Sequence, residues 1–121
     1  TRFLDRNYFR KMIENFKIKG LEKLINNSSI KEIYPMVDHI DIYVNEDGGD
    51  VTKRGYNRLD FNIYLNNPEI TSGNMYDMEL DPHYLIDHHV KQYLPYFDID
   101  KVVIDFIVWG TDGEIIYSWN N

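Results

Sequence analysis

Apolar residues near the start of the chain recur at the spacing of an amphipathic helix. Four of them fall at positions i, i+3, i+4 and i+7 and share one stripe: Phe9, Met12, Ile13 and Phe16. The pattern predicts a helix from about Asp5 to Asn26. Gly20 weakens its interior by about 1 kcal/mol relative to alanine and marks a candidate bend. Three basic residues line another face of this helix: Arg2, Arg6 and Arg10.

Two segments then alternate apolar and polar residues, as half-buried strands do. In residues 39–45 the apolar positions are 40, 42 and 44, and in residues 58–66 they are 59, 61, 63 and 65. The segment between them, residues 46–55, is polar and rich in glycine, which predicts a long hairpin loop. This loop matches neither a phosphate-binding loop nor an EF-hand calcium loop.

A second helix is expected to begin at residue 81. Asp81 is a favoured N-cap residue, and Pro82 suits the first helical turn. Pro95 should end the helix about thirteen residues later, because proline interrupts helical hydrogen bonding. The helical period places six residues on the buried side, which makes His89 a core or boundary residue: Leu85, Ile86, His89, Val90, Tyr93 and Leu94.

Residues 101–109 form an almost continuous apolar run. Such a run predicts an interior strand that is covered on both faces. Residues 110–113 contain an Asp-Gly pair, which is typical of a tight turn, and lead into a second strand over residues 114–119. The chain therefore ends in a second hairpin.

The elements predict one α+β domain over residues 1–121. Their order is helix, hairpin, helix, hairpin, and the economical arrangement has two layers. We expect a four-stranded, mainly antiparallel sheet with two helices on one face. The open face would carry the polar positions of the first hairpin: His39, Asp41, Tyr43, Arg58, Asp60, Asn62 and Tyr64. Carboxylates among these tyrosines, and the lack of an RNP1 pattern, favour a protein-binding surface over a base-stacking platform for RNA.

Charge is divided unevenly along the chain, whose net charge is −7. Residues 1–31 hold eight Lys and Arg against three Asp and Glu, and the remainder hold five against seventeen. A surface with this acidic balance repels a phosphate backbone, so broad nucleic-acid binding is not expected. The basic N-terminal segment would either contact an acidic partner or pack on the acidic remainder of its own chain.

Candidate chemistry is sparse. The chain has no cysteine, and no apolar run approaches the length of about 18 residues that a membrane span requires. His83 and Asp87 are four residues apart and could supply two ligands to a metal, or take part in acid–base chemistry. A third ligand would have to come from His39, Asp38 or a loop. The simpler interpretation is that this segment only begins a helix.

The segment from residue 67 to residue 80 shows neither helical nor strand periodicity and is predicted to be a loop. Five apolar residues alternate with acids in it: Ile70, Met75, Tyr76, Met78 and Leu80. They either cover the end of the core or form a recognition loop whose methionines adapt to a partner. The recognition hypothesis assigns partner contacts to Met75, Tyr76 and Met78.

These observations favour a small non-enzymatic protein-interaction or structural protein, for example a component of a larger assembly such as a virus particle. The alternative is an acidic inhibitor or nucleic-acid mimic that occupies a basic cleft, and a second alternative is a metal-dependent enzyme. We expect a protein partner or a homo-oligomer, no catalytic residue, no cofactor and no membrane, in a soluble protein that is intracellular or virion-associated. Partner contacts are expected from Tyr43, Tyr64, the loop residues and the arginines: Met75, Tyr76, Met78, Arg2, Arg6 and Arg10.

Overall fold

The computed structural model describes residues 15–45, 57–99 and 102–121. The predicted arginine row of Arg2, Arg6 and Arg10 and the whole predicted loop of the first hairpin, residues 46–55, lie outside these ranges. A first helix covers residues 15–26 of the described chain. It is followed by α2 (Ile30–Ile33), β1 (Val37–Asn45), β2 (Asn57–Leu65), α4 (Pro82–Tyr84), η1 (Leu85–Val90), η2 (Lys91–Phe97), β3 (Val102–Trp109) and β4 (Ile115–Trp119).

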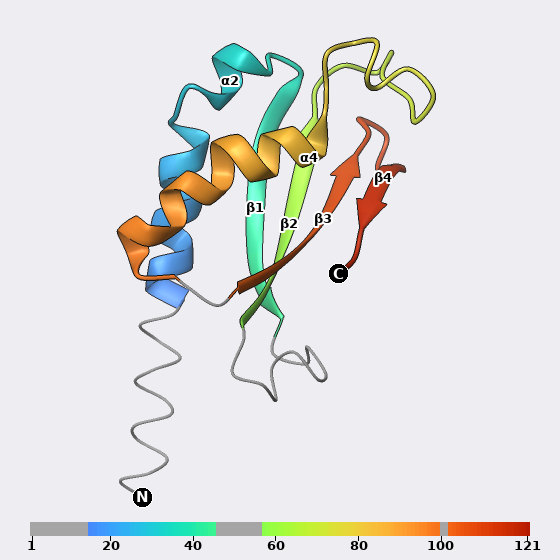
Figure 1. The fold of residues 1–121 in the computed structure, drawn as a ribbon. Coiled ribbons are helices and arrows are strands. Elements are labelled where there is room, and N and C mark those ends of the chain that lie inside the picture. Colours follow the sequence, from blue (N-terminus) through green and yellow to red (C-terminus); the bar gives the residue numbers. More distant parts are fainter. Residues whose placement is uncertain (1–14, 46–56, 100–101) are drawn as a thin grey trace, which may run out of the picture.

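The four strands form one sheet in the order β1-β2-β3-β4. The prediction of an α+β fold with a four-stranded sheet is confirmed. The predicted antiparallel arrangement is met in part: β1 pairs with β2 and β3 pairs with β4 in antiparallel fashion, but β2 and β3 are parallel. The cause is the connection over residues 66–101, whose helical part returns the chain to the same end of the sheet, so that β3 runs in the direction of β2 (Figure 1).

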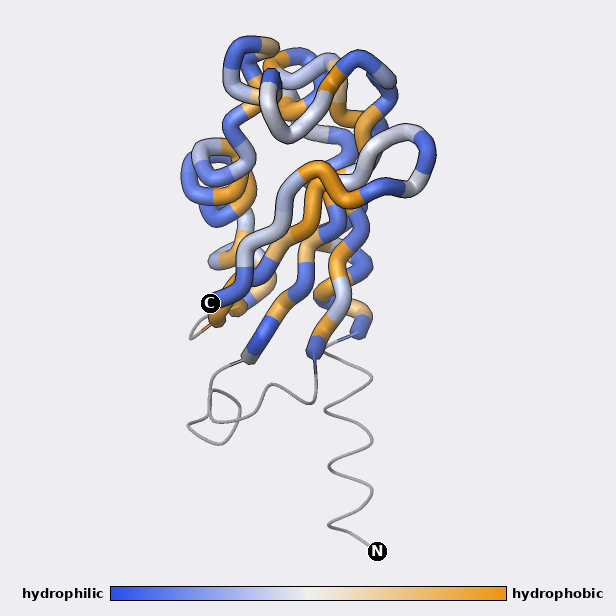
Figure 2. The backbone as a smooth tube through the Cα atoms, turned by 90° about the vertical axis from the view of Figure 1, so that its right-hand side faces the viewer, coloured by the Kyte–Doolittle hydropathy of each residue, from blue (hydrophilic) through white to orange (hydrophobic). Residues whose placement is uncertain are grey.

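The helical segments and the sheet form two layers. The first helix and the helical run from α4 to η2 lie on the same side of the strands (Figure 1). Hydrophobic and hydrophilic positions alternate along the strands (Figure 2). One strand face therefore packs against the helices, where Leu59, Phe61 and Ile63 are among the most deeply buried side chains of the core.

Strand β3 is interior in the sheet, but it is not covered on both faces as its apolar run predicted. Its pairing with β2 places Val103 beside Arg58 and Ile107 beside Asn62, on the face opposite the core. Val103 and Ile107 remain partly exposed there. Within the described ranges no helix covers this open face, because the described helices lie on the other one.

The second helical segment begins as predicted and ends later than predicted. Asp81 accepts a hydrogen bond from the backbone N–H of Tyr84 (3.1 Å), so it is the N-cap. The segment then changes from one α-helical turn to the π-helical η1 and the 3₁₀-helical η2, and Pro95 lies inside η2 instead of ending the helix. In such short irregular turns the missing N–H of proline removes a single bond, so the helix continues to Phe97.

Gly20 is a packing position and not a bend. The first helix runs through it without interruption. A Cβ atom at this position would lie 2.7 Å from Cε1 of Phe97. The absence of a side chain at Gly20 therefore lets the ring of Phe97, at the end of η2, approach the first helix closely.

Candidate functional site

The polar positions predicted for the open face do lie together. The β1–β2 register pairs His39 with Tyr64, Asp41 with Asn62, and Tyr43 with Asp60. Residues that are paired on neighbouring strands share a face, so the open face of the hairpin is as the alternation predicted. Across the parallel pair, Asp60 is the register partner of Asp105 on β3.

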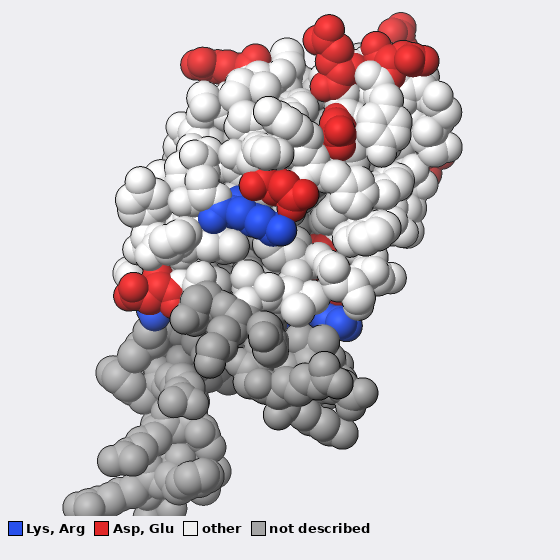
Figure 3. Space-filling view, viewed as in Figure 1, with Lys and Arg blue, Asp and Glu red and all other residues white. Residues whose placement is uncertain are grey.

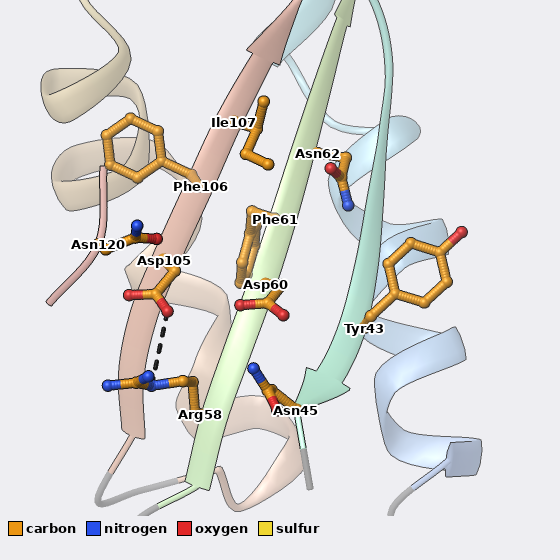
Figure 4. Close-up of a pocket in the computed structure, with 10 residues that line it drawn as sticks. All are labelled: Tyr43, Asn45, Arg58, Asp60, Phe61, Asn62, Asp105, Phe106, Ile107 and Asn120. Atoms are coloured by element: carbon orange, nitrogen blue, oxygen red, sulfur yellow. Dashed lines mark ion pairs between the residues drawn. The ribbon is translucent and has the colours of Figure 1, made fainter. Parts of the chain in front are cut away.

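A polar hollow of about 500 Å³ lies on this face. We call it the Asp60 hollow. Its side chains come from three strands: Tyr43 and Asn45 from β1, Arg58, Asp60 and Asn62 from β2, and Asp105 from β3 (Figure 4). Asn120, which follows β4, completes the rim. The hollow thus combines two carboxylates, one guanidinium group, several amides and a phenol.

Asp105 is buried and held by groups of its own chain. Its Oδ1 accepts the backbone N–H of Asn121 (2.8 Å), and its Oδ2 lies 3.5 Å from Nε of Arg58. Arg58 in turn donates from Nη2 to the carbonyl of Asn121 (3.1 Å). Both oxygens of Asp105 are therefore occupied. The hydrogen bonds of Asp105 and Arg58 to Asn121 fasten the segment after β4 to the centre of the sheet.

Asp60 is the carboxylate that remains available. Burial, and next the negative charge of Asp105, raise the pKa of Asp60, while Arg58 and a hydrogen bond from Asn45 lower it. Among the described residues no ion pair is formed by Asp60, although Arg58 is near. The described side chains of the hollow therefore hold two carboxylates and one cation, and the surplus negative charge is on Asp60.

This arrangement suits the binding of a cationic group better than acid–base catalysis. Two facing carboxylates, one with a raised pKa, are the groups that glycoside hydrolysis uses. Here one of them, Asp105, is engaged at both oxygens and would have to release Asn121 or Arg58 before it could act on a substrate. A guanidinium or ammonium group, by contrast, needs only the partly exposed carboxylate of Asp60.

An aromatic row crosses the same face at the other end of the strands. The rings of His39 and Tyr64 stack with centroids 4.5 Å apart, and Tyr64 and Trp109 follow at 6.4 Å. Nε1 of Trp109 donates to Oδ1 of Asn62 (2.8 Å). Tyr64 thus lies between two rings on the open face, with His39 on one neighbouring strand and Trp109 on the other.

The loop predicted over residues 67–80 covers one end of the core. Ile70, Met75 and Leu80 are buried, and Met75 is only 1% exposed. Met75 could reach a partner only if the loop opened, so its burial argues against the predicted partner contact. Tyr76 is 57% exposed, and Met78 packs partly against the core while it remains partly exposed. The buried residues of the loop thus cover the end of the core, while Tyr76 and Met78 keep exposed surface.

His83 and Asp87 are not brought together as metal ligands. Nε2 of His83 is hydrogen-bonded to the hydroxyl of Tyr117 (2.5 Å), whereas Asp87 pairs with Lys91 (2.8 Å). His83 also packs edge-on against Phe106. Within residues 15–45, 57–99 and 102–121, no three His, Asp or Glu side chains are grouped to hold a metal.

Asp105 is the site residue that the sequence did not reveal. It interrupts the apolar run of residues 101–109, and a lone acidic residue in a strand otherwise read as buried is a signal for a partnered carboxylate. Its partners could not be found in the same way. Arg58 and Asn121 are separated from it by 47 and 16 residues, so only the fold joins them.

No described helix of the chain is both long enough and apolar enough to span a bilayer. Comparisons with protein-family models, curated protein sequences and solved structures find no match to this chain.

Proposed function

We propose that the protein is a small non-enzymatic interaction module that binds a protein partner through the open face of its sheet. The observation that carries this proposal is the pattern of β3. An interior strand presents Val103, Ile107 and Trp109 to a face that no described helix covers. Apolar side chains at the centre of a sheet are stabilised by burial, which a partner on this face would complete.

The edges of the sheet support a face as the binding surface. Side chains of the first helix occupy the free edge of β1, where Asn26 and Glu22 bond to backbone groups. The opposite edge, β4, has only five residues and an irregular register against β3. Both features hinder the addition of a further strand, which favours the open face over a sheet edge as the binding surface.

The Asp60 hollow favours a partner with a basic group at this place. Tyr43 is 54% exposed beside the hollow, and the surplus carboxylate is on Asp60. A lysine or arginine of the partner would pair with Asp60, and the ring of Tyr43 would add a cation–π contact. This feature also favours a second candidate function, an acidic inhibitor that occupies a basic cleft on its partner.

The test compares two tyrosines that are changed in the same way. Partners captured from a lysate of the native source are identified by mass spectrometry, purified and titrated against each variant by calorimetry. Tyr43→Ser should weaken binding about tenfold or more, since an exposed tyrosine at an interface is a common hot spot. Tyr96→Ser, on η2 in the helical layer and 76% exposed, should leave the affinity unchanged.

Equal affinities of the two variants would contradict the open face as the binding surface. For the second candidate, an added DNA or RNA duplex should displace the protein from the captured partner. If it does not, the captured cleft is not a nucleic-acid site, and the inhibitor hypothesis loses its support.

A further inference from the structure

A second concave surface lies at the end of the molecule formed by the turn before β1 and the loop after β2. It has a volume of about 510 Å³. Pro35, Met36, Ile70 and Met78 supply its apolar wall, and Asp77 and Glu79 supply its charged rim. We call it the methionine groove. It shares no lining residue with the Asp60 hollow.

The walls of the groove are held in place by hydrogen bonds. On one side, the backbone N–H of Asn66 donates to the carbonyl of Met36 (2.8 Å), and Nδ2 of Asn66 donates to the carbonyl of Pro35 (3.0 Å). On the other side, the backbone N–H of Met78 donates to the carbonyl of Asn74 (3.0 Å). A preformed groove orders few groups when it binds a ligand, so less conformational entropy is lost on binding.

The segment that carries Asp77 and Glu79 ends as a helix C-terminus does. The N–H of Leu80 donates to the carbonyl of Met75, and the N–H of Glu79 donates to that of Tyr76, both at 3.0 Å. Met75 and Leu80 are buried beneath. This is the bonding of a Schellman motif, whose penultimate residue takes the left-handed conformation and is most often glycine.

Glu79 occupies that left-handed position, with φ at 65°. A residue with a Cβ atom is strained there, whereas glycine is not. The chain therefore keeps a carboxylate at the rim of the groove against the local backbone preference. Strain of this kind is concentrated at functional sites.

Charge around the groove has one sign. Asp77 and Glu79 are exposed, and the residues that line the groove include no lysine or arginine. The sequence has no lysine or arginine between Leu59 and Val90. Acidic side chains gather at this end of the molecule, over α2 and residues 66–81 (Figure 3). An apolar wall inside an acidic rim complements an apolar side chain that has basic neighbours.

We propose that the methionine groove binds a protein segment in which an apolar side chain is flanked by Lys or Arg. The apolar side chain lies against Met36 and Met78, whose flexible thioethers adapt to its shape. The flanking cations pair with Asp77 and Glu79. This site is separate from the open face and does not depend on binding there.

The probe is a pair of synthetic peptides, Gly-Lys-Lys-Leu-Lys-Lys-Gly and the same peptide with serine in place of leucine. The full chain is labelled at the methyl groups of its four methionines and titrated by NMR. The leucine peptide should bind about tenfold more tightly than the serine peptide, because only leucine buries an apolar side chain. The methyl signals of Met36 and Met78 should move, and that of the buried Met75 should move least.

Charge variants complete the test. Glu79→Gln should weaken both peptides several-fold, while the matched change Glu32→Gln, on α2 and outside the groove lining, should not. Tyr43→Ser on the open face should not affect either peptide, which separates this proposal from the open-face proposal. No binding of the leucine peptide at millimolar concentration, equal affinities of the two peptides, or unmoved signals of Met36 and Met78 would overturn it. Insensitivity to Glu79→Gln would do the same.

Discussion

The side-chain amide of Asn26 pairs with both backbone polar groups of Ile40, as a neighbouring strand would. Nδ2 donates to the carbonyl of Ile40 and Oδ1 accepts its N–H, each at 2.8 Å. Two residues further along β1, Oε2 of Glu22 accepts a hydrogen bond from the N–H of Ile42 (3.0 Å). Side chains from two successive turns of the first helix therefore bond three backbone groups on the free edge of β1, those of Ile40 and the N–H of Ile42.

Asn26→Ala should destabilise the protein by about 1–3 kcal/mol, because it leaves two backbone groups of Ile40 without partners. The variant should also aggregate more readily, since the edge of β1 becomes available for pairing. Urea denaturation measures the loss of stability, and light scattering measures the aggregation.

Two further variants define the cause. Asn26→Asp keeps the acceptor for the N–H of Ile40 and loses the donor, so its stability should fall between those of the wild type and Asn26→Ala. Asn27→Ala changes an exposed neighbour whose side chain is not part of this pairing, and it should have little effect. If Asn27→Ala costs as much as Asn26→Ala, the loss comes from the helix and not from the edge of the sheet.

Local patterns located the strands and the start of the second helical segment. The alternation in residues 39–45 and 58–66 predicted β1 and β2, because side chains of a strand point to opposite faces in turn. Asp81 was predictable as an N-cap because its partner, the backbone N–H of Tyr84, lies only three residues further along the chain. These features depend on near neighbours in the sequence.

The features that were missed depend on distant neighbours. Gly20 looked like a bend because its contact, the ring of Phe97, is far along the chain. The apolar run of β3 predicted cover on both faces, because an apolar run without alternation does not indicate which face of the strand packs against the helices. The pairing of Asp60 with Asp105 required the parallel register of β2 and β3, which no local pattern encodes.

Asp60→Asn should stabilise the protein at neutral pH and have little effect in acid. The ordinary pKa of this carboxyl is 3.8, and burial followed by the charge of Asp105 raises it in the folded protein. Folding therefore favours the protonated form. The stability that protonation contributes is fully present below the ordinary pKa and is lost as the pH rises through the raised pKa.

Melting temperatures of the wild type and Asp60→Asn, measured across this pH range, check the prediction. The difference should be a few degrees in favour of Asp60→Asn at about pH 7 and should vanish below about pH 4. Asp60→Glu keeps a carboxylate in the hollow and should retain the decline with rising pH. A constant difference between the wild type and Asp60→Asn at every pH would assign the effect to packing and not to charge.

Glu79→Gly should make the protein more stable and its methionine groove a weaker binding site. Glycine adopts the left-handed backbone conformation of residue 79 without the strain of a Cβ atom, although it loses more conformational entropy on folding. The net gain should be up to about 1 kcal/mol in the free energy of unfolding. Glu79→Ala removes the same carboxylate and keeps the Cβ atom, so it should show no such gain.

Both variants should bind the leucine peptide more weakly than the wild type, and by the same factor, because the rim of the methionine groove loses one negative charge in each. Urea denaturation and the peptide titration, applied to the same three proteins, separate the two effects. If both variants bind the peptide as tightly as the wild type, the charge at residue 79 has no part in recognition, and the strain at this position is left without a functional reason.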